Sequence, residues 1–422
     1  MLNAPSARRL ESAVNIADLR LAARQRAHRM VFDYLDAGAD DEITLRRNKD
    51  AYSSLELHPR VLAGLKPPLD LSARFMRSEC ALPFFVSPTA GSKMFHADGE
   101  QGVARAAAKH GVMYSLSTMG TSAPAEVAAA IPPKHPKLFQ LYVWKDRALV
   151  RDMLRQAMDN GFDALALTVD LTWYGNRERD VRNGFTVPPA YTLRQIADAV
   201  RAPAWSWDFL ANEEYAYAAV KLAAEGAFYT LVAFIRDAFD PSFDWDDAEW
   251  LVNEWGDRGP VALKGVLTPE DARLAVERGF DAVWVSNHGG RQLETSPAAI
   301  DVLPNIRDAL GGTGLAVELV VDGGVQRGTD VLKGLALGAD AVALGKPYLY
   351  GLGAGGEAGV DRAFTILRDE LERAFGLLGV GTTAELRRRI GRGEGLVRRR
   401  GVSARDFPDP GAAERGWGGG IF

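Results

Sequence analysis

The chain contains almost no cysteine, and it lacks a hydrophobic run long enough to cross a membrane. Cys80 is the one cysteine among 422 residues, which excludes an intramolecular disulfide framework and a cysteine-based metal site. We expect Cys80 to be a small buried hydrophobe and expect no metal site elsewhere. The longest stretch of low charge, residues 215–235, is interrupted by two charged residues and a glycine. It is therefore too short for a spanning helix, although it could lie at an interface.

An excess of charge of one sign is also missing. The 50 basic and 55 acidic residues give a formal net charge of −5, and the only dense basic run, Arg387 to Arg400, lies near the C-terminus. Nucleic acid is therefore not an expected partner. Residues 1–15 carry charges and lack the apolar segment of a signal peptide, which together with the single cysteine indicates a cytoplasmic location.

Short apolar runs alternate with helical patterns from about residue 82 onward. Most of the runs are about 21 to 36 residues apart, the repeat expected of βα units with buried parallel strands. An eightfold βα repeat closes most naturally as a (β/α)8, or TIM, barrel. The predicted strands are 82–87, 112–116, 137–143, 163–169, 261–266, 281–286, 316–321 and 339–344.

Helix signals lie between these runs. Thr268 and Pro269 provide an N-cap and a first-position proline, and Gly279 ends the predicted helix. Apolar residues within 149–158 repeat at helical spacing and predict a helix packed on the barrel. Residues 16–35 share this periodicity and predict a helical cap over one end of the barrel.

One gap in the repeat is much longer than the others. Residues 171–245, between the fourth and fifth strands, are rich in aromatic residues and predict a lid or substrate wall, with an oligomer contact as the alternative. We therefore expect a single barrel domain over 1–390, with N-terminal helices in 1–75 and the lid in 171–245. The Gly/Arg-rich extension, 391–422, is expected to cover a neighbouring chain or to be loosely ordered.

A base and a fixed cation follow the sixth predicted strand. His288 and Arg291 stand three residues apart in the segment 286–294, SNHGGRQLE. An imidazole and a guanidinium at a strand end can remove a proton from a substrate that carries a carboxylate. The other histidines are not accompanied by a cation at a predicted strand end, and we interpret them as structural.

Glycines and cations follow the last two strands, in 322–328 and 344–347. Barrels commonly bind phosphate there through backbone N–H groups, so a phosphorylated cofactor or substrate is indicated. Lys264, in the fifth strand, could offset charge on such a cofactor or form a Schiff base.

These segments together resemble the family of FMN-dependent 2-hydroxy acid oxidases and dehydrogenases, which includes glycolate oxidase, lactate oxidase and the flavin-dependent lactate and mandelate dehydrogenases. The resemblance covers about residues 16–390. It rests on SNHGGRQLE, on LKGVLTPEDA at 263–272, on FQLYVWKDR at 139–147, on LTVD at 167–170 and on DGGVQRGTDVLKGLALGAD at 322–340.

The resemblance implies the oxidation of an L-2-hydroxy acid, lactate-like or larger, to the 2-oxo acid, with the hydride equivalent passing to flavin N5. His288 would be the base, with Asp170 hydrogen-bonded behind it. Arg291 and Arg177 would hold the substrate carboxylate, and the hydroxyls of Tyr34 and Tyr142 would complete the pocket.

The resemblance also implies contacts to FMN. Lys264 would lie near the N1 edge of the flavin ring, where it would stabilise negative charge. The implied ring contacts are Pro88, Thr89, Ala90, Ser117, Gln140, Thr168 and Ser286, and the implied ribityl and phosphate contacts are Asp322, Gly323, Gly324, Gln326, Gly345 and Lys346.

Four positions depart from the family pattern. Gln326 and Lys346 stand where family members usually carry arginine, so the phosphate pocket keeps one cation at the matched positions, with Arg327 adjacent in sequence. We expect FMN to bind nevertheless, with reduced affinity. Glu294 replaces the usual aspartate, and Met119 replaces a bulky aromatic of the glycolate-specific members, which indicates room for a substrate side chain.

Expectations for the electron acceptor and for the oligomeric state come from the resemblance alone. Ala90 is typical of members that react with O2, whereas a quinone- or carrier-linked, membrane-associated dehydrogenase is the alternative. A homotetramer is implied. An aldolase-like barrel that uses Lys264 as a Schiff base is a remoter alternative, and a catalytically silent flavin-binding protein is another.

Overall fold

The computed structural model describes residues 10–142, 144–185, 193–211, 239–311 and 316–400. Its centre is an eight-stranded sheet in which each strand from the second to the seventh pairs in parallel with the next one in the sequence, and the last pairs with the first. A hydrogen bond from Val86 N to Met113 O (3.1 Å) joins the remaining edges. The predicted strands are confirmed, within about two residues, as β4 (Phe84–Val86), β5 (Tyr114–Ser117), β6 (Lys137–Leu141), β7 (Ala164–Thr168), β8 (Val261–Val266), β9 (Ala282–Val285), β10 (Glu318–Val321) and β11 (Ala341–Leu344).

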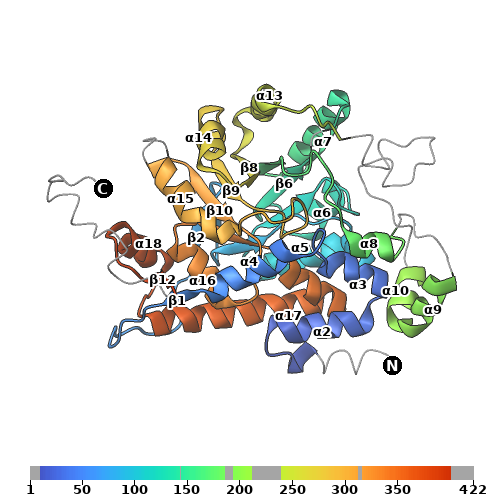
Figure 1. Cartoon of the computed structure of the whole chain (residues 1–422), viewed down its shortest axis with the longest axis horizontal. Helices are drawn as coiled ribbons and strands as arrows, with labels where there is room; N and C mark the ends of the chain where they lie inside the picture. Colours follow the sequence, from blue (N-terminus) through green and yellow to red (C-terminus); the bar gives the residue numbers. More distant parts are fainter. Residues whose placement is uncertain (1–9, 143, 186–192, 212–238, 312–315, 401–422) are drawn as a thin grey trace.

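Helices alternate with these strands and surround the sheet (Figure 1). The TIM-barrel prediction is therefore confirmed. The helices are α5 (Gly99–Lys109), α6 (Pro124–Ala130), α7 (Arg147–Asp159), α13 (Trp245–Trp255), α14 (Pro269–Glu277), α15 (Ala299–Gly311), α16 (Gly328–Ala336) and α17 (Lys346–Leu378).

The helix signals read from the sequence act as expected. The Thr268 hydroxyl accepts a hydrogen bond from Asp271 N (3.2 Å) at the start of α14, and Gly279 lies beyond its end with a positive φ of 88°. In α7, Val150, Met153 and Leu154 form the buried face. Each helix thus buries one apolar face against the strands, which is the packing that holds a barrel together.

The barrel interior is narrow and filled with small side chains around a few aromatic rings. Trp284 and Phe85 meet edge to face with ring centroids 5.1 Å apart. A two-stranded hairpin, β2 (Ala73–Phe75) and β3 (Ser78–Cys80), adds Phe75 and Cys80 to this interior core. Cys80 is buried as predicted, and burial raises the pKa of its thiol to about 12. The interior is therefore a packed core, and any ligand site must lie at an end of the barrel.

The N-terminal segment forms more than one helix. The periodicity over 16–35 belongs to α2 (Ile16–Arg26) and α3 (Arg29–Asp36), which are separated by extended backbone at Ala27 and His28. His28 caps α3, since its Nδ1 accepts from Met30 N (3.2 Å). Histidine is not a usual capping residue, so this break could not be predicted from the sequence. Helix α2 lies along α17 in Figure 1, and α4 (Ile43–Ser53) follows α3.

The remaining described elements come from the insertion and the C-terminal region. The insertion contributes α8 (Glu178–Arg182), α9 (Leu193–Arg201) and α10 (Pro203–Ala211), and the predicted interfacial segment 215–235 lies outside the described residues. After α18 (Thr383–Gly391), β12 (Val397–Arg399) pairs antiparallel with β1 (Leu55–Leu57). The prediction of loose order or contact with a neighbour was thus wrong for residues 397–399, which pair with their own chain.

Candidate active site

A cavity of about 500 Å³ opens at the carboxyl ends of the barrel strands. Because these ends all face one rim, polar residues far apart in the sequence meet there. The predicted site residues that line it are Tyr34, Pro88, Thr89, Ala90, Met119, Tyr142, Arg177, Lys264, His288, Arg291, Asp322, Gly323, Gly324, Gln326, Gly345 and Lys346. The others, Ser117, Gln140, Thr168, Asp170 and Ser286, lie outside this lining.

The base candidate is oriented by a carboxylate. His288 Nδ1 lies 2.9 Å from Asp170 Oδ1, and an ionised carboxylate can only accept, so Nδ1 carries the proton and Nε2 keeps its lone pair. The backbone of His288 is in the left-handed region (φ 57°) and donates to Ser286 Oγ at 3.0 Å. This turn aims the imidazole away from the strand, and the two side chains form one proton-accepting unit.

Burial and neighbouring charges set the ionisation of this unit. Burial lowers the pKa of His288 below its ordinary 6.5, and Lys264 and Arg177 add to the lowering, while Asp170 opposes it. Burial acts to raise the pKa of Asp170, but His288 and Lys264 outweigh it, and the pKa falls below 3.8. A neutral imidazole beside an ionised carboxylate is therefore the favoured state near neutral pH.

Two arginines face the same cavity. Arg291 Nη1 donates to the carbonyls of Tyr34 (2.7 Å) and Ala37 (3.1 Å), and Arg177 Nη1 donates to the Tyr174 hydroxyl (2.8 Å). Among the described residues, neither arginine makes an ion pair with a carboxylate. Burial and the charge of Arg177 lower the pKa of Arg291. Arg177 is buried and Arg291 is half-buried, and the carboxylate of Asp180 interacts electrostatically with both without forming an ion pair. Two such cations that face one cavity form a site for an anion, which would compensate their desolvation.

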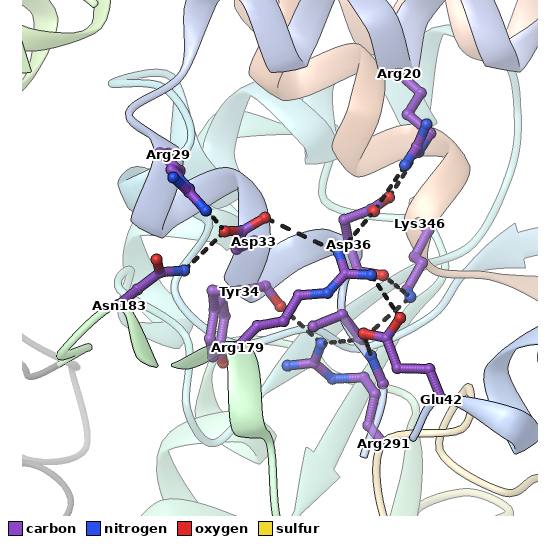
Figure 2. A network of polar contacts seen from close by, with 12 residues as sticks. Arg20, Arg29, Asp33, Tyr34, Asp36, Glu42, Arg179, Asn183, Arg291 and Lys346 are labelled. Atoms are coloured by element: carbon purple, nitrogen blue, oxygen red, sulfur yellow. Dashed lines mark hydrogen bonds and ion pairs between the residues drawn. The ribbon is translucent and has the colours of Figure 1, made fainter. Parts of the chain in front are cut away.

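The last turn of α3 binds several side chains (Figure 2). Asp36 accepts two hydrogen bonds from Arg20 (2.6 and 2.7 Å). It also accepts one from the Tyr350 hydroxyl (2.8 Å). The carbonyls of Asp36 and Ala37 accept from Lys346 Nζ at 2.8 and 3.3 Å. Sequence reasoning missed Asp36, since it belongs to no strand end and no motif.

The same turn connects the two ends of the cavity. Ala37 O accepts from both Lys346 and Arg291. Arg179 of α8 reaches Asp36 from the insertion at 3.3 Å and also pairs with Glu42 (Figure 2). A helix C-terminus carries partial negative charge, so this turn is suited to holding cations. It fixes both Arg291 and Lys346.

Replacing Asp36 by asparagine is expected to lower the free energy of unfolding at pH 7 by about 2 kcal/mol, because its charged hydrogen bonds are lost in a buried setting. Burial acts to raise the pKa of Asp36, but Arg20 and Tyr350 lower it far below 3.8. Its stabilising contribution is therefore complete above that value and is lost as the pH falls below it.

Urea titrations over a range of pH check this expectation, and the gap between wild type and Asp36→Asn should narrow in acid. Glu79→Gln is the control, since Glu79 and its partner Arg74 are 77% and 66% exposed and lie 3.6 Å apart, an ion pair that contributes little to stability. An equal loss in both variants would contradict a special role for Asp36.

The end of the cavity formed by Lys264, Asp322 and the following glycines has the features of a cofactor-binding site. Lys264 Nζ donates to Ser286 Oγ (3.1 Å) and lies 3.7 Å from Asp322. Gly323 and Gly324 have positive φ, and a Cβ on Gly324 would lie 2.2 Å from Asn48 O. Glycine is therefore required at this turn, where backbone comes close to backbone.

Several buried polar atoms near this end lack a protein partner. Within the described residues, no hydrogen-bond partner exists for Gln140 Nε2, Thr168 Oγ1 or Asp322 Oδ1. The other end of the Gln140 amide accepts from Ser117 Oγ at 2.7 Å. Unpaired buried groups are costly, so atoms of this kind mark the place of a ligand.

Two basic residues, Lys346 and Arg327, were considered above for the predicted phosphate site, and only one of them lies in the cavity. Lys346 lines the cavity. Arg327 instead pairs with Glu370 at 2.9 Å and lies outside the cavity lining. Gln326 lines the cavity, but its amide donates to Val325 O (2.9 Å). Arg327 is therefore not part of the site, although it is adjacent to Gln326 in the sequence.

The wall around His288 is largely apolar and aromatic. Met119 lies in it as predicted and is buried. Four aromatic residues of this wall come from the insertion 171–245, which was interpreted above as a lid or substrate wall, namely Trp173, Tyr174, Phe185 and Phe239. Sequence reasoning missed Phe95, which lies between β4 and α5 and belongs to no motif.

The fold and the cavity define a barrel with a base, an anion site and a cofactor-binding site on one rim. Comparison with known families assigns it further. The model of the family described as FMN-dependent dehydrogenase matches residues 23–392, and the chain belongs to this family. It is accordingly an FMN-dependent oxidoreductase of the group that oxidises 2-hydroxy acids.

Individual relatives agree with this assignment. A Mycobacterium tuberculosis protein named "Putative L-lactate dehydrogenase" is 40% identical over 381 residues, 90% of this chain and 89% of that protein. Glycolate oxidase 1 of Zea mays is 39% identical over 375 residues, 89% and 94% of the two chains. The crystal structure of (S)-mandelate dehydrogenase, a monotopic membrane protein, is similar with a TM-score of 0.83 at 32% identity, covering 89% and 98%.

FMN fits the residues of the cofactor-binding site. The unpaired atoms of Gln140, Thr168 and Asp322 can hydrogen-bond to a flavin ring and a ribityl chain, which carry both donors and acceptors. The close-packed turn at Gly323 and Gly324 and the start of α17 at Lys346 offer backbone N–H groups and a cation to a phosphate. No group of His, Cys, Asp or Glu that could hold a metal ion occurs in the described part of the chain.

Proposed function

We propose that this protein oxidises an L-2-hydroxy acid with an apolar side chain to the 2-oxo acid. The observation that carries the proposal is that His288, which is bonded to Asp170, lines one cavity together with Arg177 and Arg291. Neither arginine makes an ion pair with a carboxylate of the described residues. A carboxylate on Arg177 and Arg291 would place the neighbouring carbon and its hydroxyl between these groups. The aromatic wall with Met119 favours a side chain larger than that of glycolate.

The residues of this chain would act on the substrate as follows. Arg177 and Arg291 bind the carboxylate and fix the orientation of the α-carbon. His288 Nε2 takes a proton from the substrate, and Asp170 stabilises the resulting imidazolium. Tyr34 and Tyr142 offer hydroxyls at the cavity wall, and burial raises the pKa of Tyr142, so its hydroxyl stays protonated and can donate.

The oxidation removes two electrons and two protons from the substrate. FMN, when bound, supplies the two-electron acceptor. Lys264 lies between Ser286 and Asp322, where its ammonium would stabilise negative charge at the ring. The implied ring contacts of Pro88, Thr89, Ala90, Ser117, Gln140, Thr168 and Ser286 remain part of the proposal.

Anaerobic mixing of the holoprotein with a panel of 2-hydroxy acids tests the substrate class. We expect the flavin absorbance to bleach fastest with L-acids that carry longer aliphatic or aryl side chains, and more slowly with glycolate. D-enantiomers should react poorly. Bleaching by glycolate alone would contradict the proposal for Met119.

The pH dependence of kcat/KM reports the state of the base. Since the pKa of His288 is lowered from 6.5, we expect a plateau near neutral pH and a fall of about tenfold per unit only below that value, where the imidazole is protonated. In Asp170→Asn the break should move further into acid, because Asp170 raises the pKa of His288. A break above pH 7 in the wild type would contradict the assignment.

We propose O2 as the electron acceptor, on the basis of Ala90. Stoichiometric hydrogen peroxide in air-saturated buffer is the expected result, and turnover that needs an added quinone would exclude it. The homotetramer and the cytoplasmic location remain predictions. The Schiff-base alternative for Lys264 gains no support from the matches above.

One observation favours the membrane-associated alternative. Ile196 and Val200 of α9 and Trp207 and Leu210 of α10 are exposed by 50% to 78%, each pair at helical spacing. These helices pack together at the edge of the molecule in Figure 1. No helix in the described ranges is long and apolar enough to cross a membrane. Cosedimentation with lipid vesicles, lost in Trp207→Glu, would support this alternative.

A further inference from the structure

The end of the cavity at Gly324, Gln326 and Lys346, where the phosphate of FMN would bind, has few cations. Gln326 is neutral and bonded to its own backbone neighbour, and Arg327 pairs with Glu370 outside the cavity. Lys346 is half-buried and already donates to two carbonyls of the α3 turn. A phosphate carries up to two negative charges, and Lys346 alone would compensate one of them.

Helix α4 brings a further cation to this end. Lys49 lines the cavity and is exposed, and it makes no ion pair within the described residues. Its neighbour Asn48 packs on the glycine turn, where the Asn48 carbonyl leaves no room for a Cβ on Gly324. Burial and then the charge of Arg291 lower the pKa of Lys346, and Lys49 adds to this lowering, so the two ammonium groups lie within electrostatic reach.

The position of α4 is fixed at two points. Glu294 accepts from Ile43 N (2.9 Å), Thr44 N (2.8 Å) and the Thr44 hydroxyl (2.6 Å), and so caps the helix from the segment that carries His288. Burial acts to raise the pKa of Glu294, but these hydrogen bonds lower it to about 2.

The second point is a reciprocal pair of amides. Asn48 and Asn287 exchange hydrogen bonds at 2.9 and 2.7 Å. Lys49 follows Asn48 directly, so its backbone is held against the barrel rim. Its side chain then needs only to extend into the cavity to meet an anion.

We infer that Lys49 is a binding residue for the FMN phosphate and supplies the second positive charge beside Lys346. The charge reaches the site from α4, a helix that precedes the barrel. This assignment concerns cofactor affinity and holds whatever the substrate and the electron acceptor are.

Flavin binding by full-length protein tests the inference, with FMN and riboflavin as probes and flavin fluorescence as the signal. Lys49→Gln is expected to raise the Kd for FMN about tenfold at low ionic strength, the loss of one charged contact. The Kd for riboflavin, which lacks the phosphate, should not change. The effect on FMN should shrink at high salt.

Two further variants serve as controls. Lys49→Arg keeps the charge and should bind FMN nearly as the wild type does. Arg47→Gln removes a charge from the same helix outside the cavity lining, where Arg47 pairs with Asp301 at 3.7 Å, and should leave the Kd for FMN unchanged. An unchanged Kd in Lys49→Gln, or equal loosening of FMN and riboflavin, would overturn the inference.

Discussion

Replacing His288 by alanine is expected to slow anaerobic flavin reduction about 10²- to 10⁴-fold, the usual contribution of a positioned base, while FMN stays bound. The physical reason is that no other lining residue near the arginines combines a lowered pKa with a free ring nitrogen. FMN should be retained because His288 contacts Asp170 and Ser286 and not the glycine turn. Stopped-flow absorbance of the flavin measures the rate, and the spectrum before mixing reports the bound cofactor.

Asp170→Asn is the matched variant for this experiment. It keeps the shape of the partner and removes the charge that stabilises the imidazolium, so we expect a loss smaller than that of His288→Ala. Reduction of the flavin at the wild-type rate in His288→Ala would refute the assignment of the base.

Replacing Arg291 by lysine is expected to lower kcat/KM about 10²-fold. Lysine keeps the charge but cannot hold two backbone carbonyls and still present a planar pair of donors to a carboxylate. Arg291 is fixed by the carbonyls of Tyr34 and Ala37, so the conservative change removes an orientation as well as a contact. Steady-state kinetics with the preferred acid of the panel gives the value.

The amide of the same acid is the control for Arg291. It lacks the negative charge, so it should react poorly and to the same extent with wild type and Arg291→Lys. If the variant lost as much activity on the amide as on the acid, Arg291 would act through the fold and not through the carboxylate.

Residues at strand ends could be placed from the strand pattern, whereas residues on helices and loops could be placed only where the family resemblance covered them, as it did for Tyr34 and Arg177. His288, Arg291 and Lys264 follow or belong to buried parallel strands, and the carboxyl ends of such strands always share a rim. Asp36 and Lys49 belong to helices that precede the barrel. Their positions depend on the packing of α3 and α4, for which a single sequence contains no periodic signal.

Glu294 illustrates the same limit within a recognised motif. The sequence showed only that the side chain of Glu294 is longer than that of the usual aspartate. Its partners in the structure are backbone groups of Ile43 and Thr44, about 250 residues away in the chain. Helix capping from so distant a segment is decided by tertiary packing, and the usual signals of a helix start lie next to the helix. The break between α2 and α3 escaped prediction for a related reason, because His28 is not a usual cap.

The sequence by itself determined the barrel, the family and about half of the residues that line the cavity, because strand periodicity, turn glycines and long motifs are local properties of the chain. Only the tertiary structure decided which cations share an anion and which are held elsewhere. Arg327 is removed from the cavity by Glu370, and Lys49 is brought to it by α4. A charge acts over a few ångströms of space, and that distance is set by packing between segments remote in the chain.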